Sequence, residues 1–485
     1  MKRKALQYSV LAILISTSAI LSYSQLNNGH GWGGDFSSYI MQAESLLSGT
    51  IDNFIKHNTF TITQSDIDFA PIAYPWGYPL LITPVIHFLG INFLGIKILG
   101  ILFYVLFLVA LFFLFEKHLP ILDNLVLLAI FALNPLLLSF PNYILADIPF
   151  LFFSTLSILL VDRFSNRTGL SSQHLLERFT IGVVLFFAFF IRASGLILLL
   201  SFFVYEFFKK PRKITFFRVV PYLSFILLFA ISLLFLPNGE KSHLLFYKDI
   251  SRITIGQNIK YYAVLGSSFF SHTPNALAIY YLVSLFFFVG IVKKYREKFL
   301  FIIYFIFTLT LYVFWPFQQG IRFLFPILPI FIYFAIEGTK AVFSYFPLPK
   351  TGWGRVIHSG FWLLIIYSFA TTSIPSAKVF FDRKQNSKGP YDETSSEMFQ
   401  YITQNISPDS IIAFYKPRVM RFRTGRDALI IKKCEHIERA DYIVRNTEEG
   451  DGEQLKDKEV KRCDIPLNEI YNDGRFIIYE ISKNE

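Results

Sequence analysis

Asp35 begins a short amphipathic segment that follows the polar stretch GHGWGG. The apolar residues of 36–48 fall largely on one helical face, and these are Ile40, Met41, Ala43, Leu46 and Leu47. Gly49 suits the C-terminal cap of this helix. Asp35 is then expected as its N-cap, which alone would explain an aspartate here. The helix N-terminus also favours the ionised carboxylate, so a general base at a lipid–water boundary is a compatible interpretation.

Asp147 is a second carboxylate, in the segment FPNYILADIPFLFF. It lies within about the first turn of an apolar run, where an ionisable group is costly in a membrane. Such residues are usually functional, and the alternative is an ordinary aspartate at a helix start.

Three cations, Lys97, Arg192 and Arg322, lie at or near the ends of apolar segments. Each one alone is explained by snorkelling to lipid headgroups. Together with two carboxylates on the same side of a membrane, they indicate a pocket for an anionic headgroup. Phosphate is the obvious candidate, because arginine binds it through two parallel hydrogen bonds.

Several side chains near these positions are candidate substrate contacts: His30, Tyr39, Tyr74 and Gln319. The aromatic residues of this region could stack on a sugar or form the ordinary aromatic belt of a membrane protein, and they are Trp32, Tyr39, Tyr74, Trp76 and Tyr78. His30, near Asp35, is also a candidate ligand of a divalent metal. The sequence contains no Walker loop, GxSxG elbow, HExxH or dinucleotide fingerprint.

The elements that position these residues are long apolar blocks. The chain has 485 residues, of which 53% are apolar and 57 are Phe. Blocks such as GIKILGILFYVLFLVALFFLF reach the roughly 20 residues that a helix needs to cross a bilayer. The sequence therefore predicts a polytopic α-helical membrane protein.

Eleven spans are expected, near 8–24, 95–115, 121–138, 143–162, 179–191, 194–208, 216–236, 275–292, 299–315, 322–343 and 356–376. The apolar run 77–91 is short and contains two prolines, which indicates an interfacial or re-entrant segment. Residues 8–24 have a signal peptide as their alternative interpretation.

The net charge of +11 is explained by the positive-inside bias rather than by a nucleic-acid partner. With a cytoplasmic N-terminus, the basic clusters MKRK, RFSNRTGLSSQHLLER, KKPRKITFFR and KKYREK all fall inside. The loops 25–94, 139–146, 238–274 and 316–321 then fall outside, as does everything after 377. Counting 77–91 as a span would place the later basic loops outside.

The composition changes near 377, where an amphipathic helix followed by short strands is expected. We expect a transmembrane domain over 1–376, with interfacial helices in its first outer loop at 25–94, and a soluble extracytoplasmic α/β domain over 377–485. Cys434 and Cys463 lie in that domain, and the sequence leaves open whether they form a disulfide or stay as thiols.

In order and spacing, these features resemble the GT-C superfamily of membrane glycosyltransferases. The matching segments are GGDFSSYIMQAESLLSG, AYPWGYPLLITPVIHFLG, LNPLLLSFPNYILADIPFLFF, RASGLILL and QQGIRFLFPILPIFIYFAIEG. Within the superfamily, the sequence looks like the branch with protein O-mannosyltransferases and lipid A aminoarabinose transferase. Two positions depart from that branch, since Phe36 follows Asp35 where many relatives have Glu, and Tyr74 replaces a lysine.

The resemblance implies inverting transfer of a sugar from a polyprenyl-phosphate donor on the extracytoplasmic face. It implies a catalytic role for Asp35 and Asp147, and donor-phosphate binding by Lys97, Arg192 and Arg322. The acceptor would be a lipid, glycan or protein hydroxyl, and the location a bacterial inner membrane. A transporter or flippase of lipid-linked sugars, or a non-catalytic protein that binds them, is the alternative.

Overall fold

A computed structural model describes residues 2–67, 69–165, 171–208, 216–237, 251–345, 353–383, 388–448, 450, 452–460, 463 and 466–482. Parts of the expected loops, at 166–170, 209–215 and 238–250, lie outside the described residues.

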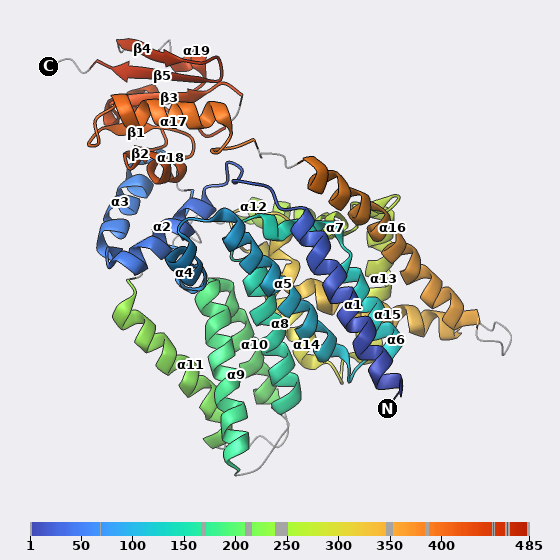
Figure 1. The fold of residues 1–485 in the computed structure, drawn as a ribbon. Helices are drawn as coiled ribbons and strands as arrows, with labels where there is room; N and C mark the ends of the chain where they lie inside the picture. The colour runs from blue at the N-terminus through green and yellow to red at the C-terminus, as the bar shows by residue number, and fades with distance from the viewer. Residues whose placement is uncertain are drawn as a thin grey trace. The chain divides into compact units, whose positions relative to one another are not determined.

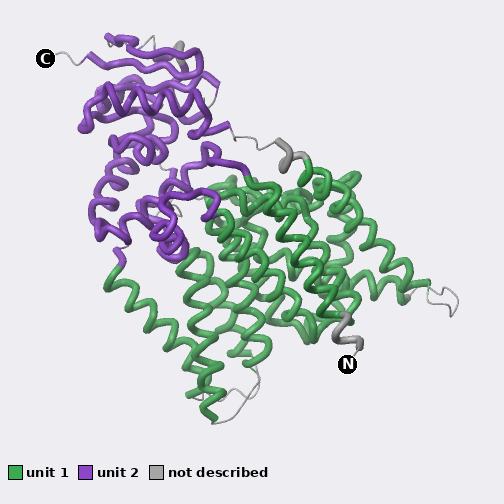
Figure 2. The backbone as a smooth tube through the Cα atoms, in the orientation of Figure 1, with its two compact units in different colours: residues 1–26, 97–235, 244–383 green, residues 27–96, 236–243, 384–485 purple. Residues whose placement is uncertain are grey.

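The chain divides into two compact units (Figure 2). Unit 1 comprises Met1–Leu26, Lys97–Phe235 and Leu244–Arg383. Unit 2 comprises Asn27–Ile96, Leu236–His243 and Lys384–Glu485. This division differs from the expected boundary at 376, because unit 1 extends to Arg383 and unit 2 also contains residues 27–96 and 236–243.

Unit 1 is a bundle of α-helices (Figure 1). Its helices are α1 (Lys2–Ser24), most of α5 (Phe93–Phe115), α6 (Ile121–Ala132), α7 (Pro135–Ser139), α8 (Asp147–Phe164), α9 (Ser172–Ile191), α10 (Leu196–Phe208), α11 (Phe216–Phe235), α12 (Arg252–Leu265), α13 (Ala276–Lys294), α14 (Phe299–Val313), α15 (Leu328–Tyr345) and α16 (Trp353–Arg383). A helix lies in each of the eleven segments expected to span.

In the described part of the chain, seven helices are long and apolar enough to cross a membrane, or eight if the bent pair α6–α7 is one span. The chain is therefore an integral membrane protein, as expected. The count of eleven stays a prediction, since α10 and α14 fall below that length.

Small residues let the helices of unit 1 approach closely. A methyl group on Gly290 of α13 would overlap the carbonyl oxygen of Phe334 on α15, and one on Gly338 would overlap that of Phe286. Such contacts are typical of membrane helices, which gain stability from close van der Waals packing.

Unit 2 contains the three helices that lie between α1 and α5 in the chain, namely α2 (Asp35–Ser48), α3 (Ile51–Gln64) and α4 (Gly77–Leu89). Gly49 caps α2 in the left-handed conformation, with φ +68°, as the sequence predicts. The expected apolar face is only partly right, because Ile40 and Ala43 are buried whereas Leu47 is 42% exposed. The buried face instead includes Gln42, whose amide pairs with the backbone of Tyr74.

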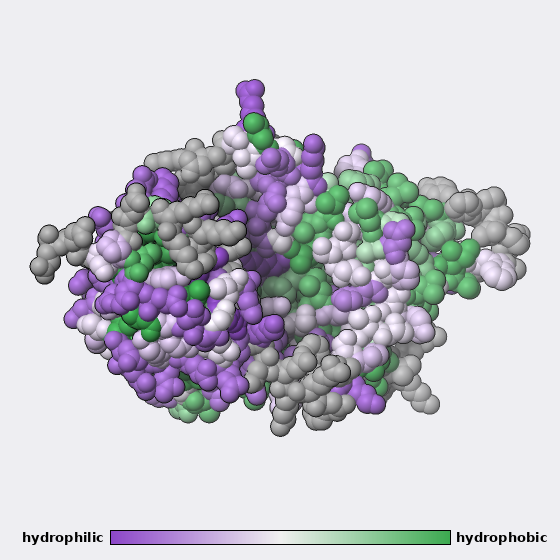
Figure 3. Space-filling model, turned by 90° about the horizontal axis from the view of Figure 1, so that it is seen from above, coloured by the Kyte–Doolittle hydropathy of each residue, from purple (hydrophilic) through white to green (hydrophobic). Residues whose placement is uncertain are grey.

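The rest of unit 2 is the C-terminal domain (388–482), a small α/β domain as predicted. It contains α17 (Glu393–Asn405), β1 (Ile411–Ala413), α18 (Pro417–Thr424), β2 (Asp427–Leu429), β3 (Tyr442–Asn446), α19 (Asp457–Val460), β4 (Leu467–Asn472) and β5 (Phe476–Ile481). The strand order is β2-β1-β3-β5-β4, with β2, β1 and β3 parallel and the β3–β5 and β5–β4 pairs antiparallel. Seen from above, the visible face of this domain is mainly hydrophilic (Figure 3).

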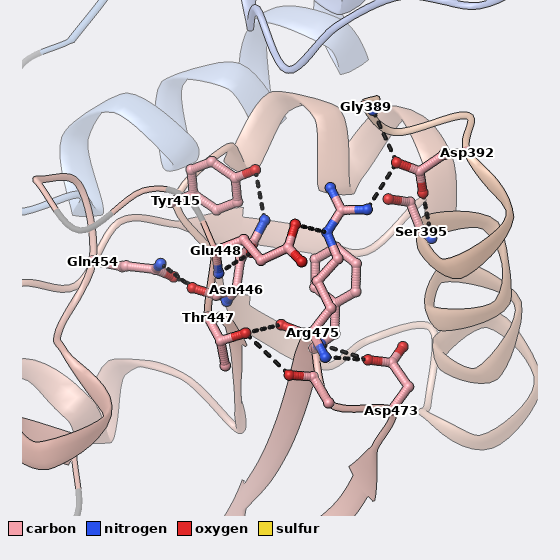
Figure 4. Close-up of polar contacts among 12 residues, drawn as sticks. Gly389, Asp392, Ser395, Tyr415, Asn446, Thr447, Glu448, Gln454, Asp473 and Arg475 are labelled. Carbon is pink, nitrogen blue, oxygen red and sulfur yellow. Dashed lines mark hydrogen bonds and ion pairs between the residues drawn. The ribbon is translucent and has the colours of Figure 1, made fainter. Parts of the chain in front are cut away.

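A disulfide and a set of polar contacts connect segments of the C-terminal domain. Cys434 and Cys463 form a disulfide, which resolves the alternative that the sequence leaves open. Asp392 caps α17 by accepting a hydrogen bond from the Ser395 amide, and its other oxygen pairs with Arg475 at 2.8 Å (Figure 4). Arg475 lies in the turn between β4 and β5, so this pair ties the start of α17 to the β4–β5 hairpin. Arg475 also lies 3.4 Å from Glu448, which follows β3.

Candidate functional site

The Asp147 carboxylate is the centre of a charged cluster in unit 1. Asp147 is the first residue of α8, and its side chain is only 4% exposed. One oxygen pairs with the Arg192 guanidinium, and the other lies 3.9 Å from Arg322. The structure therefore brings together three of the residues that the sequence singles out, from segments that are 45 and 175 positions from Asp147.

Breaks between helices place the two arginines. Arg192 follows the last residue of α9 in an extended conformation, with φ −149° and ψ 128°. Arg322 lies in a short 3₁₀ turn after Gly320, whose φ of +73° favours glycine. Both guanidinium groups contact the Phe323 ring, with the Arg192 Cζ atom 4.6 Å from its centroid.

Gln319 contacts one of these arginines. Its side-chain oxygen and its backbone oxygen both accept hydrogen bonds from Arg322. Gln319 therefore orients the Arg322 guanidinium, in addition to its expected role as a substrate contact. The cluster of two arginines and one aspartate carries a net charge of +1, which suits an anion.

Lys97 lies in α5 and is 1% exposed. Its ammonium group donates a hydrogen bond of 2.8 Å to the side-chain oxygen of Asn142. Asn142 stands five residues before Asp147, in the 3₁₀ turn that precedes α8. An ammonium group that is this deeply buried needs polar partners, which Asn142 supplies.

Asp35, in unit 2, is placed differently from the expectation. It is the first helical residue of α2, and the N-cap is Gly34. The predicted N-cap role is therefore wrong, because the helix begins one residue earlier and the carboxylate contacts the Tyr74 hydroxyl instead. That hydroxyl donates to Asp35 with an oxygen–oxygen distance of 2.6 Å. Tyr74 is held in turn by Gln42, whose amide bonds both its N–H and its carbonyl, at 3.2 and 3.0 Å.

The other candidates around Asp35 form an aromatic cluster. Tyr39 lies 4.8 Å from the Tyr74 ring and 4.9 Å from the Tyr78 ring, between ring centroids. His30 is buried, stacks on Phe36 at 4.0 Å, and its Nδ1 atom lies 2.9 Å from the Gly31 carbonyl oxygen. Within the described ranges, no group of three or more His, Cys, Asp or Glu residues could hold a metal ion.

Arg418 of α18 is a residue that the sequence does not single out. It is 2% exposed, donates to the Pro71 carbonyl and to Asn58, and places its guanidinium carbon 5.1 Å from the centroid of the Tyr74 ring. Its only signal in the sequence is the basic run KPRVMRFRTGR, which gives no indication of a contact more than 340 positions away.

Solved structures with a similar fold cover most of this chain, in agreement with the polytopic helical fold that the sequence predicts. The similar solved structures include ArnT from Cupriavidus metallidurans, in the apo state and bound to undecaprenyl phosphate. These two chains give TM-scores of 0.59 and 0.58 at 10% identity, with 96% of this chain and 97% of that chain covered.

A third similar structure is the oligosaccharyltransferase AglB from Archaeoglobus fulgidus, in complex with an inhibitory peptide and a dolichol-phosphate. It gives a TM-score of 0.54 at 12% identity, covering 92% of this chain and 70% of AglB. No family model matches the sequence, and no curated protein matches it significantly.

Proposed function

We propose that this protein is a membrane glycosyltransferase that moves a sugar from a polyprenyl-phosphate donor to an acceptor hydroxyl on the extracytoplasmic face. The observation that carries the proposal is the pairing of Arg192 and Arg322 with the buried Asp147 in a protein with the GT-C fold. The lipid phosphates bound by ArnT and AglB support the same class of donor.

In this reaction the acceptor oxygen attacks the anomeric carbon while the bond from that carbon to the phosphate oxygen breaks. Asp35 takes the acceptor proton, and the bonding electrons leave with the polyprenyl phosphate. Arg192, Arg322 and Lys97 stabilise the negative charge that develops on this leaving group, so it departs without protonation. A single in-line displacement inverts the configuration of the anomeric carbon.

The two carboxylates have different roles in the proposal. Asp147 holds the arginines in a fixed orientation, so their geometry is set before the donor binds. Asp35 accepts a hydrogen bond from the neutral Tyr74 hydroxyl, which orients its carboxylate for the proposed role as base. We place the N-terminus in the cytoplasm, because the basic loops then face inward. We place the protein in a bacterial inner membrane, as the resemblance of its sequence implies.

A transfer assay tests the proposal. The full-length protein in nanodiscs is given radiolabelled polyprenyl-phosphate sugars and host membrane extract, and wild type is compared with Asp35→Asn. Loss of a general base should lower the rate by about 100-fold or more. A known transferase of this class serves as the positive control for the extract.

Three outcomes separate the alternatives. Transfer by wild type that Asp35→Asn loses supports the proposal. Equal transfer by both proteins means that the base is another residue. Failure of wild type to consume any donor, while the control enzyme works, would favour transport or binding of lipid-linked sugars.

A further inference from the structure

The glycine-rich segment Gly29–Gly34, directly before Asp35, packs on the C-terminal domain within unit 2. Trp32 is 8% exposed and lies among four aromatic rings of that domain. The ring centroids are 5.4 to 6.2 Å from the Trp32 centroid, and they belong to Phe399, Phe414, Tyr415 and Phe476. A large aromatic side chain that is buried in this way fixes the backbone on either side of it.

The backbone of the same segment contacts the start of the C-terminal domain. A methyl group on Gly389 would overlap the carbonyl oxygen of His30. A methyl group on Gly29 would lie 2.8 Å from the Cβ atom of Tyr391, and Gly29 has a φ of +79°. Only glycine fits both positions without displacement, because the segment 29–34 and the segment 389–391 are in direct contact.

Arg418 makes a second connection from the C-terminal domain toward Asp35. Its guanidinium binds the Pro71 carbonyl and the Asn58 side chain, and it lies over the Tyr74 ring. The Tyr74 hydroxyl donates a hydrogen bond to Asp35. Burial and the neighbouring Asp35 raise the pKa of Tyr74 well above its usual value, so this hydroxyl stays protonated and remains a donor at physiological pH.

We propose that Arg418 and Trp32 are positioning residues, through which the C-terminal domain sets the location and orientation of the Asp35 carboxylate. This inference rests on the proposed function of Asp35 as a base. It gives the C-terminal domain an indirect part in the transfer step, through the placement of Asp35, in addition to any contact with an acceptor. A base that is misplaced by about 1 Å loses up to about 100-fold in rate, so such support has a measurable effect.

The kinetic test compares Arg418→Gln, Tyr74→Phe and the double variant with wild type, using the full-length protein in nanodiscs. Arg418→Gln should lower kcat by about tenfold while the KM for the donor changes less than about twofold. Tyr74→Phe removes the hydrogen bond that orients the Asp35 carboxylate, so it should lower kcat by about tenfold or more, again with less than about a twofold change in the KM for the donor. The double variant should resemble Tyr74→Phe, because Arg418 acts through Tyr74.

Arg426→Gln is the matched control. Arg426 is also a buried arginine of the C-terminal domain, but its guanidinium donates to the carbonyl groups of Thr403, Ile406 and Thr424 in the same domain. If Arg426→Gln and Arg418→Gln lower kcat equally, the effect is general loss of stability and the positioning role is refuted. Transfer by Arg418→Gln at the wild-type rate also refutes it.

Hydrogen exchange provides a test that does not depend on activity. In Arg418→Gln and Trp32→Ala, amides in 27–40 should exchange at least about tenfold faster than in wild type, whereas Arg426→Gln should leave them unchanged. If exchange in 27–40 is unchanged in both Arg418→Gln and Trp32→Ala, the inference is overturned, whether or not a donor is found. If exchange is faster in these variants and the wild-type protein transfers sugar, the inference is supported. If exchange is faster but the wild-type protein transfers no sugar, the result counts against the proposed function alone.

Discussion

Arg192→Gln should destabilise unit 1, because it leaves the buried Asp147 carboxylate without its nearer cation. The Asp147 side chain is 4% exposed, and its remaining cation, Arg322, lies at 3.9 Å. Removing one partner of a buried ion pair typically costs about 3–5 kcal/mol, because the other charge stays buried without compensation. Since the Arg192 side chain is 18% exposed, water reaches this pair in part, so we expect the lower end, about 3 kcal/mol.

The double variant Arg192→Gln/Asp147→Asn, measured beside both single variants, tests whether the loss comes from a carboxylate that has lost its nearer cation. It removes both charges and keeps two polar side chains of similar size, so the loss of unfolding free energy should fall to about 1 kcal/mol. The expected coupling between the two positions is then about 2 kcal/mol or more, well outside the few tenths found for independent sites.

The assay is thermal unfolding of the full-length protein in detergent, followed by the fluorescence of its five tryptophans. Arg163→Gln is the control, because Arg163 pairs with Glu116 at 3.4 Å and both side chains are more exposed, at 25% and 29%. This control should cost less than about 1 kcal/mol. The reasoning is refuted if Arg192→Gln melts like wild type, or if the two single effects simply add in the double variant.

Three further predictions concern the packing of the helices and the C-terminal domain. Gly290→Ala should lower the apparent melting temperature by several degrees, whereas Gly256→Ala, where a methyl group meets open space, should not; equal effects would contradict the packing. Cys434→Ser or Cys463→Ser should cost about 2–4 kcal/mol in the C-terminal domain, measured by protease resistance, and unchanged resistance would contradict a structural disulfide. Burial alone would raise the pKa of Asp392, but hydrogen bonds from Arg475 and backbone amides lower it, so its stabilising effect is complete above about pH 4 and is lost as pH falls further. Acid unfolding of Asp392→Asn should therefore be less pH-dependent than that of wild type in that range.

The sequence predicts the helices of unit 1 well because the solvent for these segments is lipid. A run of about 20 apolar residues has to form a helix there, since every backbone polar group needs a partner within its own segment. The same argument does not settle the number of spans. The helices α10 and α14 have 13 and 15 residues, so their length alone does not separate a span from a shorter buried helix.

The tertiary contacts of the candidate residues are harder to predict than the fact that these residues are unusual. A charge beside an apolar run is rare, so the sequence singles out Asp147, Arg192 and Arg322. The N-cap prediction for Asp35 is wrong, because the helix begins at Asp35 itself and its carboxylate accepts a hydrogen bond from Tyr74, 39 positions away. The sequence does not single out Arg418, since a basic run in a polar domain usually indicates a solvated surface. Local pattern finds unusual residues, whereas partners distant in the chain come from the tertiary fold.

The partners of the two carboxylates support different proposed roles for them. Asp147 faces two guanidinium groups, so its oxygens are engaged and its charge is matched before any substrate binds. Asp35 accepts a hydrogen bond from the neutral Tyr74 hydroxyl, which orients its carboxylate. A proton acceptor needs an oriented lone pair, whereas a phosphate site needs a net positive charge. Exchanging the proposed roles would place the base beside two arginines whose charge opposes proton uptake, and for this reason we propose Asp35 as the base and Asp147 as the residue that holds the arginines.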